Sequence, residues 1–383
     1  MGRMTFTDCV DLVGNSCKEF AGQKKYISTG AVNEDHINQS AVEIVNYIDK
    51  PSRANLVAES GDILFAKMQG TKKTLIINDE LSGNIYSTGF CAVHPRINVM
   101  TSKCLYYFLT SKTFLDQKDK YCSGATQKAI TNAGLKKLII NIPPIEQQNE
   151  ICKILDLISH IINLKKAELL KLDDLIKAKF LEMFGTLDNP NKDFENAVLK
   201  DLCNKITDGK HCGCTMEEGT GRYFVGAREI YDNKVHYDTA PEINVEEFEK
   251  DYKRCNVEIG DFLIVNTGAT IGKSAIALDR RTKHTLLQKS VALLKVKADV
   301  LNPVFLQYCY KVNTHMYLVE NASAQPNLLL SKINATRIYV PEIDMQNEFA
   351  DFVHQVNISK TIVQKSLDET QMLLDSLMQK YFD

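Results

Sequence analysis

The sequence of 383 residues lacks any run of about 18 apolar residues, the length that a transmembrane helix requires. Its beginning, MGRMTFTDCVDL, lacks the apolar core of a secretory signal peptide. The 11 cysteines form no framework of paired spacings, so reduced thiols are expected rather than disulfides. These absences argue against a membrane protein and a disulfide-rich secreted protein. They predict a cytoplasmic chain that makes no membrane contact.

Metal-ligand pairs are also scarce. One cluster, His211-Cys212-Gly213-Cys214 with Cys203 upstream, has the residue types of half a zinc site. Structural zinc sites usually need a second pair of ligands, and the sequence offers none. The alternative is a polar turn that happens to carry thiols. We predict no metal and no cofactor, and the role of this cluster stays open.

The net charge is small, −2, but it is unevenly distributed. Residues 65–140 carry 11 Lys/Arg against 4 Asp/Glu, and residues 262–340 carry 10 against 3, so each segment has a net charge of +7. Two equally basic segments in an acidic chain indicate two surfaces that contact anions. The alternative is that both segments are simply solvated faces.

A glycine-rich stretch, DFLIVNTGATIGKSAIAL at 261–278, raises the question of a phosphate-binding loop. Such a loop has the pattern G-x-x-x-x-G-K-[ST] and opens a helix, so that its N–H groups wrap the phosphates. Here Gly268 and Gly272 have one residue too few between them. The following SAIALD alternates like a strand. The pattern therefore favours a basic turn between two strands.

The chain repeats itself at an offset of nearly 200 residues. INIPPIEQQNEI at 140–151 corresponds to IYVPEIDMQNEF at 338–349, an offset of 198. ESGDILFAKMQG at 59–70 corresponds to EIGDFLIVNTGA at 258–269, an offset of 199. Matches in the same order with nearly constant offset indicate a duplicated module.

Each module ends in a long amphipathic segment. Residues 146–184 contain neither Gly nor Pro, and their apolar residues recur mostly three or four apart, as they do again near the C-terminus. A helix of about 40 residues is roughly 60 Å long, and a narrow apolar stripe on it favours pairing with another helix. The alternative is that each helix packs only on its own module. The predicted pairing residues are Ile151, Leu155, Ile158, Ile162, Leu169, Leu172, Ile176, Phe352, Val356, Val363, Leu367, Leu374 and Leu377.

Upstream of each helix, short apolar runs between Gly and Asn turns predict strands, with short helices around residues 103–109 and 303–310. Each module is therefore a mixed α/β domain followed by a long helix. This duplicated layout resembles the specificity subunit of type I restriction–modification systems over essentially the whole chain. The resemblance is strong for SGATQKAITNAGLKKLIINIPPIEQQ and for GDFLIVNTGATIGKSAI. Two departures are PEIDMQNE, which lacks the second Pro, and QGTKKTLII, which lacks the Gly-Lys of Gly272-Lys273.

The resemblance implies an α/β (mixed) fold with two pseudo-repeated target-recognition domains separated by two long antiparallel, coiled-coil-like helices. Each domain would read one half of a bipartite site in double-stranded DNA. Two modification (methyltransferase) subunits and restriction (endonuclease/translocase) subunits would be the partners, and the chain itself would not be an enzyme. The implied ranges are 1–143 for target-recognition domain 1, 144–185 for the first long helix, 186–341 for target-recognition domain 2 and 342–383 for the second long helix.

Candidate DNA contacts follow from side-chain chemistry, because Lys neutralises phosphates while amide and hydroxyl groups reach base edges. The candidates are Lys67, Gln69, Lys72, Lys73, Gln127, Lys128, Asn132, Asn266, Thr267, Thr270, Lys273, Ser274, Gln325 and Asn327. Gln127 and Gln325 occupy equivalent positions in the two copies, and for them the alternative to a DNA contact is that the side chain braces a loop. For the whole chain the alternatives are a DNA-binding or interaction scaffold outside restriction, and a nucleotide-binding protein.

Overall fold

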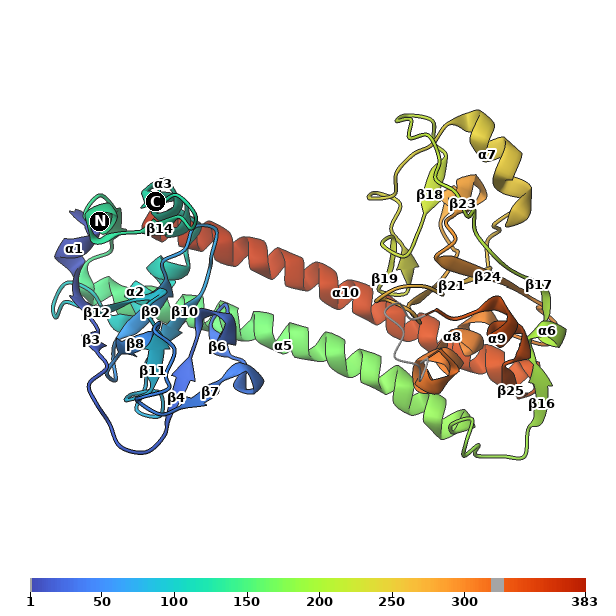
Figure 1. The fold of residues 1–383 in the computed structure, drawn as a ribbon, viewed down its shortest axis with the longest axis horizontal. Helices are drawn as coiled ribbons and strands as arrows, with labels where there is room; N and C mark the ends of the chain where they lie inside the picture. Colours follow the sequence, from blue (N-terminus) through green and yellow to red (C-terminus); the bar gives the residue numbers. More distant parts are fainter. Residues whose placement is uncertain (1, 318–326) are drawn as a thin grey trace. The chain divides into compact units, whose positions relative to one another are not determined.

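The structure is a computed structural model that describes residues 2–317 and 327–383 (Figure 1). The chain divides into two compact units: unit 1 comprises Met1–Ala167 and Gln364–Asp383, and unit 2 comprises Glu168–Val363. Two helices of 40 residues each, α5 (Ile145–Phe184) and α10 (Ile343–Phe382), contribute to both units, because each continues from one unit into the other. The long helices that the sequence predicted are thus present.

Unit 1 is built on a four-stranded antiparallel sheet in the order β10-β9-β12-β2. Its strands are β2 (Val10–Val13), β9 (Ile63–Ala66), β10 (Thr74–Ile76) and β12 (Phe90–Pro95). Every residue of β9 is buried, because Ile63 and Phe65 pack in one hydrophobic core while Leu64 and Ala66 pack in another. A strand buried on both faces gives a continuous apolar run, which explains the sequence of this strand.

A second sheet of unit 1 has five strands in the order β3-β8-β11-β4-β7, and β11 pairs with β4 in parallel. Its strands are β3 (Asn15–Ser16), β4 (Lys24–Ile27), β7 (Glu43–Val45), β8 (Ala54–Val57) and β11 (Ile85–Ser87). Short elements complete the unit: β1 (Gly2–Thr5), α1 (Phe6–Cys9), β5 (Val32–Asn33), β6 (His36–Ile37), α2 (Ser102–Thr110), α3 (Lys112–Lys120), β13 (Cys122–Ser123), β14 (Ala129–Ile130), α4 (Asn132–Leu135) and β15 (Ile139–Ile142).

Unit 2 repeats this topology. Its four-stranded sheet has the order β17-β24-β21-β22, and β18 pairs with β23 in parallel as β4 does with β11. The strands are β16 (Glu195–Val198), β17 (Cys203–Asp208), β18 (Tyr223–Val225), β19 (Ile230–Tyr231), β20 (Lys234–Val235), β21 (Phe262–Val265), β22 (Ser274–Ile276), β23 (Thr285–Leu287), β24 (Val291–Val296) and β25 (Arg337–Val340). The helices are α6 (Leu199–Leu202), α7 (Val245–Asp251), α8 (Pro303–Val312) and α9 (Leu330–Ala335). The duplication and the mixed α/β class predicted from the sequence are confirmed.

Both long helices bury aromatic side chains in the cores of the units. In unit 1, Leu155 of α5 and Phe382 of α10 lie in one hydrophobic cluster with Phe108 and Phe114, and the rings of Phe108 and Phe382 are 6.0 Å apart. In unit 2 the rings of Phe180 (α5) and Phe349 (α10) are 5.3 Å apart, and both are fully buried. Burying one such side chain stabilises a fold by roughly 1.5–3 kcal/mol. The helices are therefore integral parts of each unit's core.

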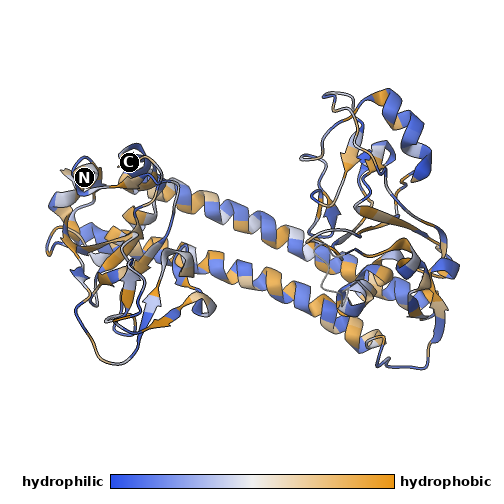
Figure 2. Ribbon diagram, viewed as in Figure 1, coloured by the Kyte–Doolittle hydropathy of each residue, from blue (hydrophilic) through white to orange (hydrophobic). Residues whose placement is uncertain are grey.

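Within each unit the two helix segments run antiparallel. In unit 1, Leu155 shares a hydrophobic cluster with Phe382, and further along α5 the Lys165 ammonium donates to Ser366 Oγ at 2.5 Å. In unit 2 the ammonium of Lys360 pairs with Asp173 at 2.6 Å. All the residues predicted to pair the helices are buried or half-buried, and hydrophobic residues recur along both helices among hydrophilic ones (Figure 2).

A buried glutamine joins each long helix to its unit. Gln148 Oε1 accepts a hydrogen bond from Thr101 N at 2.8 Å, and its amide donates to Val99 O at 2.8 Å and Pro143 O at 3.0 Å. Gln346 makes the same three bonds to the corresponding backbone groups of unit 2. Both side chains are fully buried. This explains why the two helix starts share this glutamine although the residue before it differs.

Replacing Gln148 by methionine is expected to lower the free energy of unfolding of unit 1 by about 2–4 kcal/mol. The apolar side chain keeps the volume but leaves one amide and two carbonyls without partners, and a buried unsatisfied polar group costs about 1–3 kcal/mol. Gln147→Met is the matched control, since Gln147 is exposed. Chemical denaturation of both variants measures the difference, and equal stability of the two would contradict this role for Gln148.

Candidate nucleic-acid interface

In unit 1 the turn after β9 lies beside the segment that precedes α4. We call residues 67–73 and 127–132 the first loop pair. Gln69 N donates to Lys128 O at 3.0 Å, and Ile130 N donates to Lys67 O at 2.9 Å. Met68 and Ala129 form an antiparallel β-bridge between these two bonds. Two segments that the sequence separates by more than 50 residues, and that both carry predicted DNA contacts, are thus adjacent in space.

The predicted residues of the first loop pair differ in their surroundings. Those that are exposed are Gln69, Lys72, Gln127, Lys128 and Asn132, whereas Lys67 and Lys73 are half-buried. The ammonium of Lys73 donates to Thr29 O at 2.7 Å, so it already has a partner inside the unit. Gln127 Oε1 accepts from Arg53 at 3.4 Å. Gln69, Gln127 and Lys128 are exposed at the surface of the first loop pair, and the Gln69 amide also donates to Asp119 O at 3.5 Å.

Arg53 was not predicted. It is exposed and lies 74 residues before Gln127, outside the basic segment that drew attention to the loops. Its guanidinium donates to Gln127 Oε1, which places the start of β8 next to the first loop pair. A long-range contact of this kind leaves no local signal in a sequence. The guanidinium adds a further cation beside the first loop pair, and its bond to Gln127 supports the bracing alternative for that residue.

Unit 2 forms the corresponding arrangement. We call residues 266–273 and Asn327 the second loop pair. Leu328 N donates to Asn266 O at 2.7 Å, and Thr267 is the bridge partner of Asn327. The hydroxyl of Thr267 also donates to Asn327 Oδ1 at 3.2 Å. The same pairing of a strand end with a polar segment therefore occurs in both units.

Fewer of the predicted DNA contacts are exposed in the second loop pair than in the first. Lys273 and Asn327 are exposed, and Thr267 and Thr270 are half-buried. Asn266 and Ser274 are each only 4% exposed, and Ser274 Oγ accepts from Gln307 at 3.4 Å. Their side chains therefore lie in the core of unit 2 and not at its surface. Gln325 lies outside the residues that the structure describes.

The glycine-rich stretch of unit 2 is a hairpin. Ile264 pairs with Ser274 in an antiparallel ladder, and the residues after the turn form β22, not a helix. Gly272 has φ +88°, and a Cβ there would lie 2.4 Å from the ring of Tyr317. Glycine is thus required by the backbone conformation and by the close approach of Tyr317. The Gly-Lys pair belongs to a turn and does not form a phosphate-binding loop.

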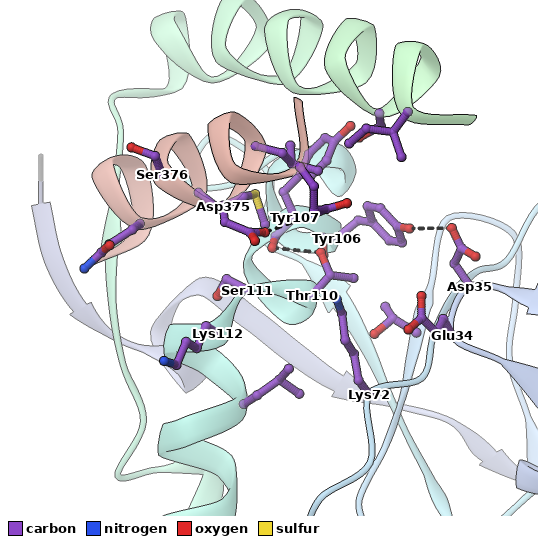
Figure 3. Close-up of a pocket in the computed structure, with 18 of the residues that line it drawn as sticks. Glu34, Asp35, Lys72, Tyr106, Tyr107, Thr110, Ser111, Lys112, Asp375 and Ser376 are labelled. Atoms are coloured by element: carbon purple, nitrogen blue, oxygen red, sulfur yellow. Dashed lines mark hydrogen bonds between the residues drawn. The ribbon is translucent and has the colours of Figure 1, made fainter. Parts of the chain in front are cut away.

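A cavity of about 1180 Å³ opens in unit 1 beside the first loop pair (Figure 3). Lys72 points into it, and the Tyr106 hydroxyl donates to Asp35 at 3.3 Å across it. Burial, followed by the Asp35 carboxylate, raises the pKa of Tyr106, so the phenol stays protonated as a donor. The walls of the cavity also carry Lys112 and Asp375, so positive and negative side chains are mixed there. Lys72, a predicted DNA contact, is therefore part of the cavity wall.

The thiol-containing turn of unit 2 is held by ion pairs. Lys210 pairs with Asp251 at 2.7 Å, and the Asp251 carboxylate holds the pKa of Lys210 above its ordinary value. His211 lies 3.2 Å from Asp208, which also pairs with Arg254. In the described ranges, no group of three or more His, Cys, Asp or Glu side chains is arranged to hold a metal ion. These contacts are those of a polar turn.

Within residues 2–317 and 327–383, none of the helices combines the length and the apolarity that crossing a membrane demands.

The chain belongs to the family of type I restriction modification DNA specificity domains, which matches residues 12–173 and again 191–370. It is 26% identical over 166 residues to the type I restriction enzyme HindI specificity subunit of Haemophilus influenzae, a match that covers 43% of this chain and 36% of that protein. It is 21% identical over 320 residues to the EcoBI specificity subunit of Escherichia coli, covering 76% of this chain and 66% of that protein. The matches thus span about a third of the length of the HindI subunit and just under two thirds of the length of the EcoBI subunit.

Solved structures show the same fold. A chain from a structure described as the basis of complex assembly and conformational transition of the type I R-M system superposes with a TM-score of 0.66 at 18% identity, covering 99% of this chain and 97% of that one. The type I restriction–modification S subunit from M. genitalium gives 0.54 at 15% identity, covering 100% and 96%. The family and the twofold domain content that the sequence predicted are confirmed.

Proposed function

We propose that the chain is the specificity subunit of a type I restriction–modification complex and reads a bipartite site in double-stranded DNA. Family membership supports the class of protein. The observation that carries the proposal is the duplicated loop pair, in which each unit brings exposed polar side chains of two distant segments together. Asn and Gln can pair with adenine edges and lysines with phosphates. Each loop pair would read one half of the site.

The chemistry is assigned to partner subunits. Two methyltransferase subunits and restriction subunits would bind the chain, which would supply recognition without catalysis. We keep residues 1–143 and 186–341 as the target-recognition domains, with 144–185 and 342–383 as the long helices. We also place the chain in the cytoplasm, where it would meet the proposed DNA substrate.

The function is tested by mapping modified adenines in the host genome with and without the gene for this chain. The expected result is one bipartite motif that loses its modification when the chain is absent. Binding of the purified complex to duplexes with and without that motif gives the second readout. Equal affinity for both duplexes, or modification that persists without the chain, would refute the proposal and favour an interaction scaffold.

Changing Lys128 to alanine is expected to weaken binding to all DNA sequences alike. Lys128 is exposed in the first loop pair, and losing one phosphate contact reduces the slope of log K against log salt by about one. Lys192→Ala is the control, since Lys192 is also exposed but lies in the connection between α5 and β16. A slope that is the same for both variants would remove Lys128 from the interface.

A further inference from the structure

We propose that Lys118 is a positioning residue that fixes the shape of the first loop pair, and thereby sets specificity for one half of the DNA site. This inference rests on the proposed function. Lys118 lies in the last turn of α3 and is fully buried. Its ammonium donates to Met68 O at 2.9 Å and to Thr71 O at 2.7 Å, and lies 3.5 Å from Ala66 O.

The neighbour of Lys118 holds the same turn from the other side. Asp119 Oδ2 accepts from Gly70 N at 3.0 Å, and its backbone oxygen accepts from the Gln69 amide at 3.5 Å. The carboxylate also faces the Lys118 ammonium at 3.6 Å. The end of α3 thus binds carbonyls and an amide of residues 66–71. Lys67 and Gln69, two predicted DNA contacts, lie between these fixed points.

A buried ammonium is an inefficient way to stabilise a fold. Removing the charge from water costs several kcal/mol, and hydrogen bonds with an ion pair offset this only in good geometry. Burial lowers the pKa of Lys118, whereas the Asp119 carboxylate acts in the opposite direction. Apolar side chains of similar volume are often as stabilising as a buried ion pair. The ammonium instead fixes the conformation of the turn, because three of its carbonyl oxygens must point at one nitrogen atom.

Among the described residues, the turn of the second loop pair is closed by backbone bonds, with Gly272 N donating to Val265 O at 2.9 Å and Lys273 N donating to Thr270 O at 3.1 Å. The first turn has backbone bonds of this kind too, from Ala66 N to Lys73 O at 2.9 Å for example, and it has the Lys118 ammonium in addition. Among the residues that the structure describes, Lys118 is the one buried lysine. A change at Lys118 should therefore affect the reading of one half of the site and leave the other half unaffected.

The test uses the full chain in complex with its modification subunits, and duplexes that carry the mapped motif intact or with a mismatch in one half. Lys118→Met removes the ammonium and keeps the volume. Lys120→Met is the matched control, because it removes an exposed lysine of the same helix. Lys118→Met should lose about tenfold or more of the discrimination against mismatches in one half, the scale of a lost base contact. Discrimination in the other half, and both halves for Lys120→Met, should match the unaltered protein.

Full discrimination by Lys118→Met in both halves, or an equal loss in both, would overturn the inference. If Lys118→Met does not fold, Asp119→Ala replaces it, since Asp119 is partly exposed and its loss frees Gly70 N. The same one-sided loss is expected, and its absence overturns the inference equally. An unaltered complex without any sequence preference would instead refute the proposed function itself, so the two failures are distinguishable.

Discussion

Replacing Phe382 by alanine is expected to lower the free energy of unfolding of unit 1 by about 3–5 kcal/mol, the range for truncating a buried aromatic side chain. Phe382 is the last residue of α10 and is 1% exposed. It packs in the hydrophobic cluster that contains Phe108, with Met378 one turn earlier on the same helix. Although Phe382 is distant in sequence from residues 1–167 of unit 1, its removal leaves a cavity in the core that it shares with them.

Two measurements check this prediction. Denaturation followed by hydrogen exchange should show earlier unfolding in unit 1, while the amides of unit 2 keep their protection. Met372→Ala is the control, since Met372 is 63% exposed on the same helix, and a surface change of this kind is usually worth within about 0.5 kcal/mol. Phe180→Ala is the reciprocal variant and should destabilise unit 2. Unchanged stability of unit 1 in Phe382→Ala would show that the end of α10 is not part of its core.

The long helices illustrate what the sequence could predict. A segment of about 40 residues without Gly or Pro, with apolar residues three or four apart, has few alternatives to a helix. The sheet strands were likewise predicted by fully apolar runs such as Phe262–Val265. The repeat then predicted the second unit from the first. These features depend on local patterns, so no knowledge of distant contacts was needed.

The packing partners of the helices were harder to predict. The stripe gave the buried face, but it could not show that Phe180 and Phe382 end in the aromatic cores of unit 2 and unit 1. The role of Gln148 was also missed, because its three partners are backbone groups of loops. Periodicity shows which face of a helix is apolar, whereas the identity of the covering surface depends on topology.

The sequence identified segments that lie together in the structure, but not which of their side chains are exposed. Both segments of each loop pair were named, and the structure brings them together. Asn266 follows directly on Val265, and both are buried, so its side chain points into the core. All four residues of β21 are buried, because each face of the strand packs in a hydrophobic cluster. The residue that follows β21 is therefore covered whichever face its side chain takes. How far this cover extends past the strand end depends on tertiary packing, which the sequence did not provide.

The apolar contacts of the α10 end set a condition for exchanging recognition domains. Residues 1–142 pack on the first part of α5 through Ile151 and Leu155, and on the end of α10 through Met378 and Phe382. A domain taken from a relative must present a matching apolar surface to these side chains. The relative should therefore be one whose domain carries apolar residues where residues 1–142 contact these four side chains.

Replacing residues 1–142 by the corresponding domain of such a relative is expected to change one half of the recognised motif completely and to leave the other half as it was. Unit 2 keeps its own core and its own loop pair, so its contacts do not depend on the exchanged residues. The measurement is the motif at which adenines are modified in cells that carry the chimera. The reciprocal exchange of residues 186–341 is the control and should change the opposite half. Because each loop pair is held within one unit, a chimera that alters both halves together would show that the two units do not read DNA independently.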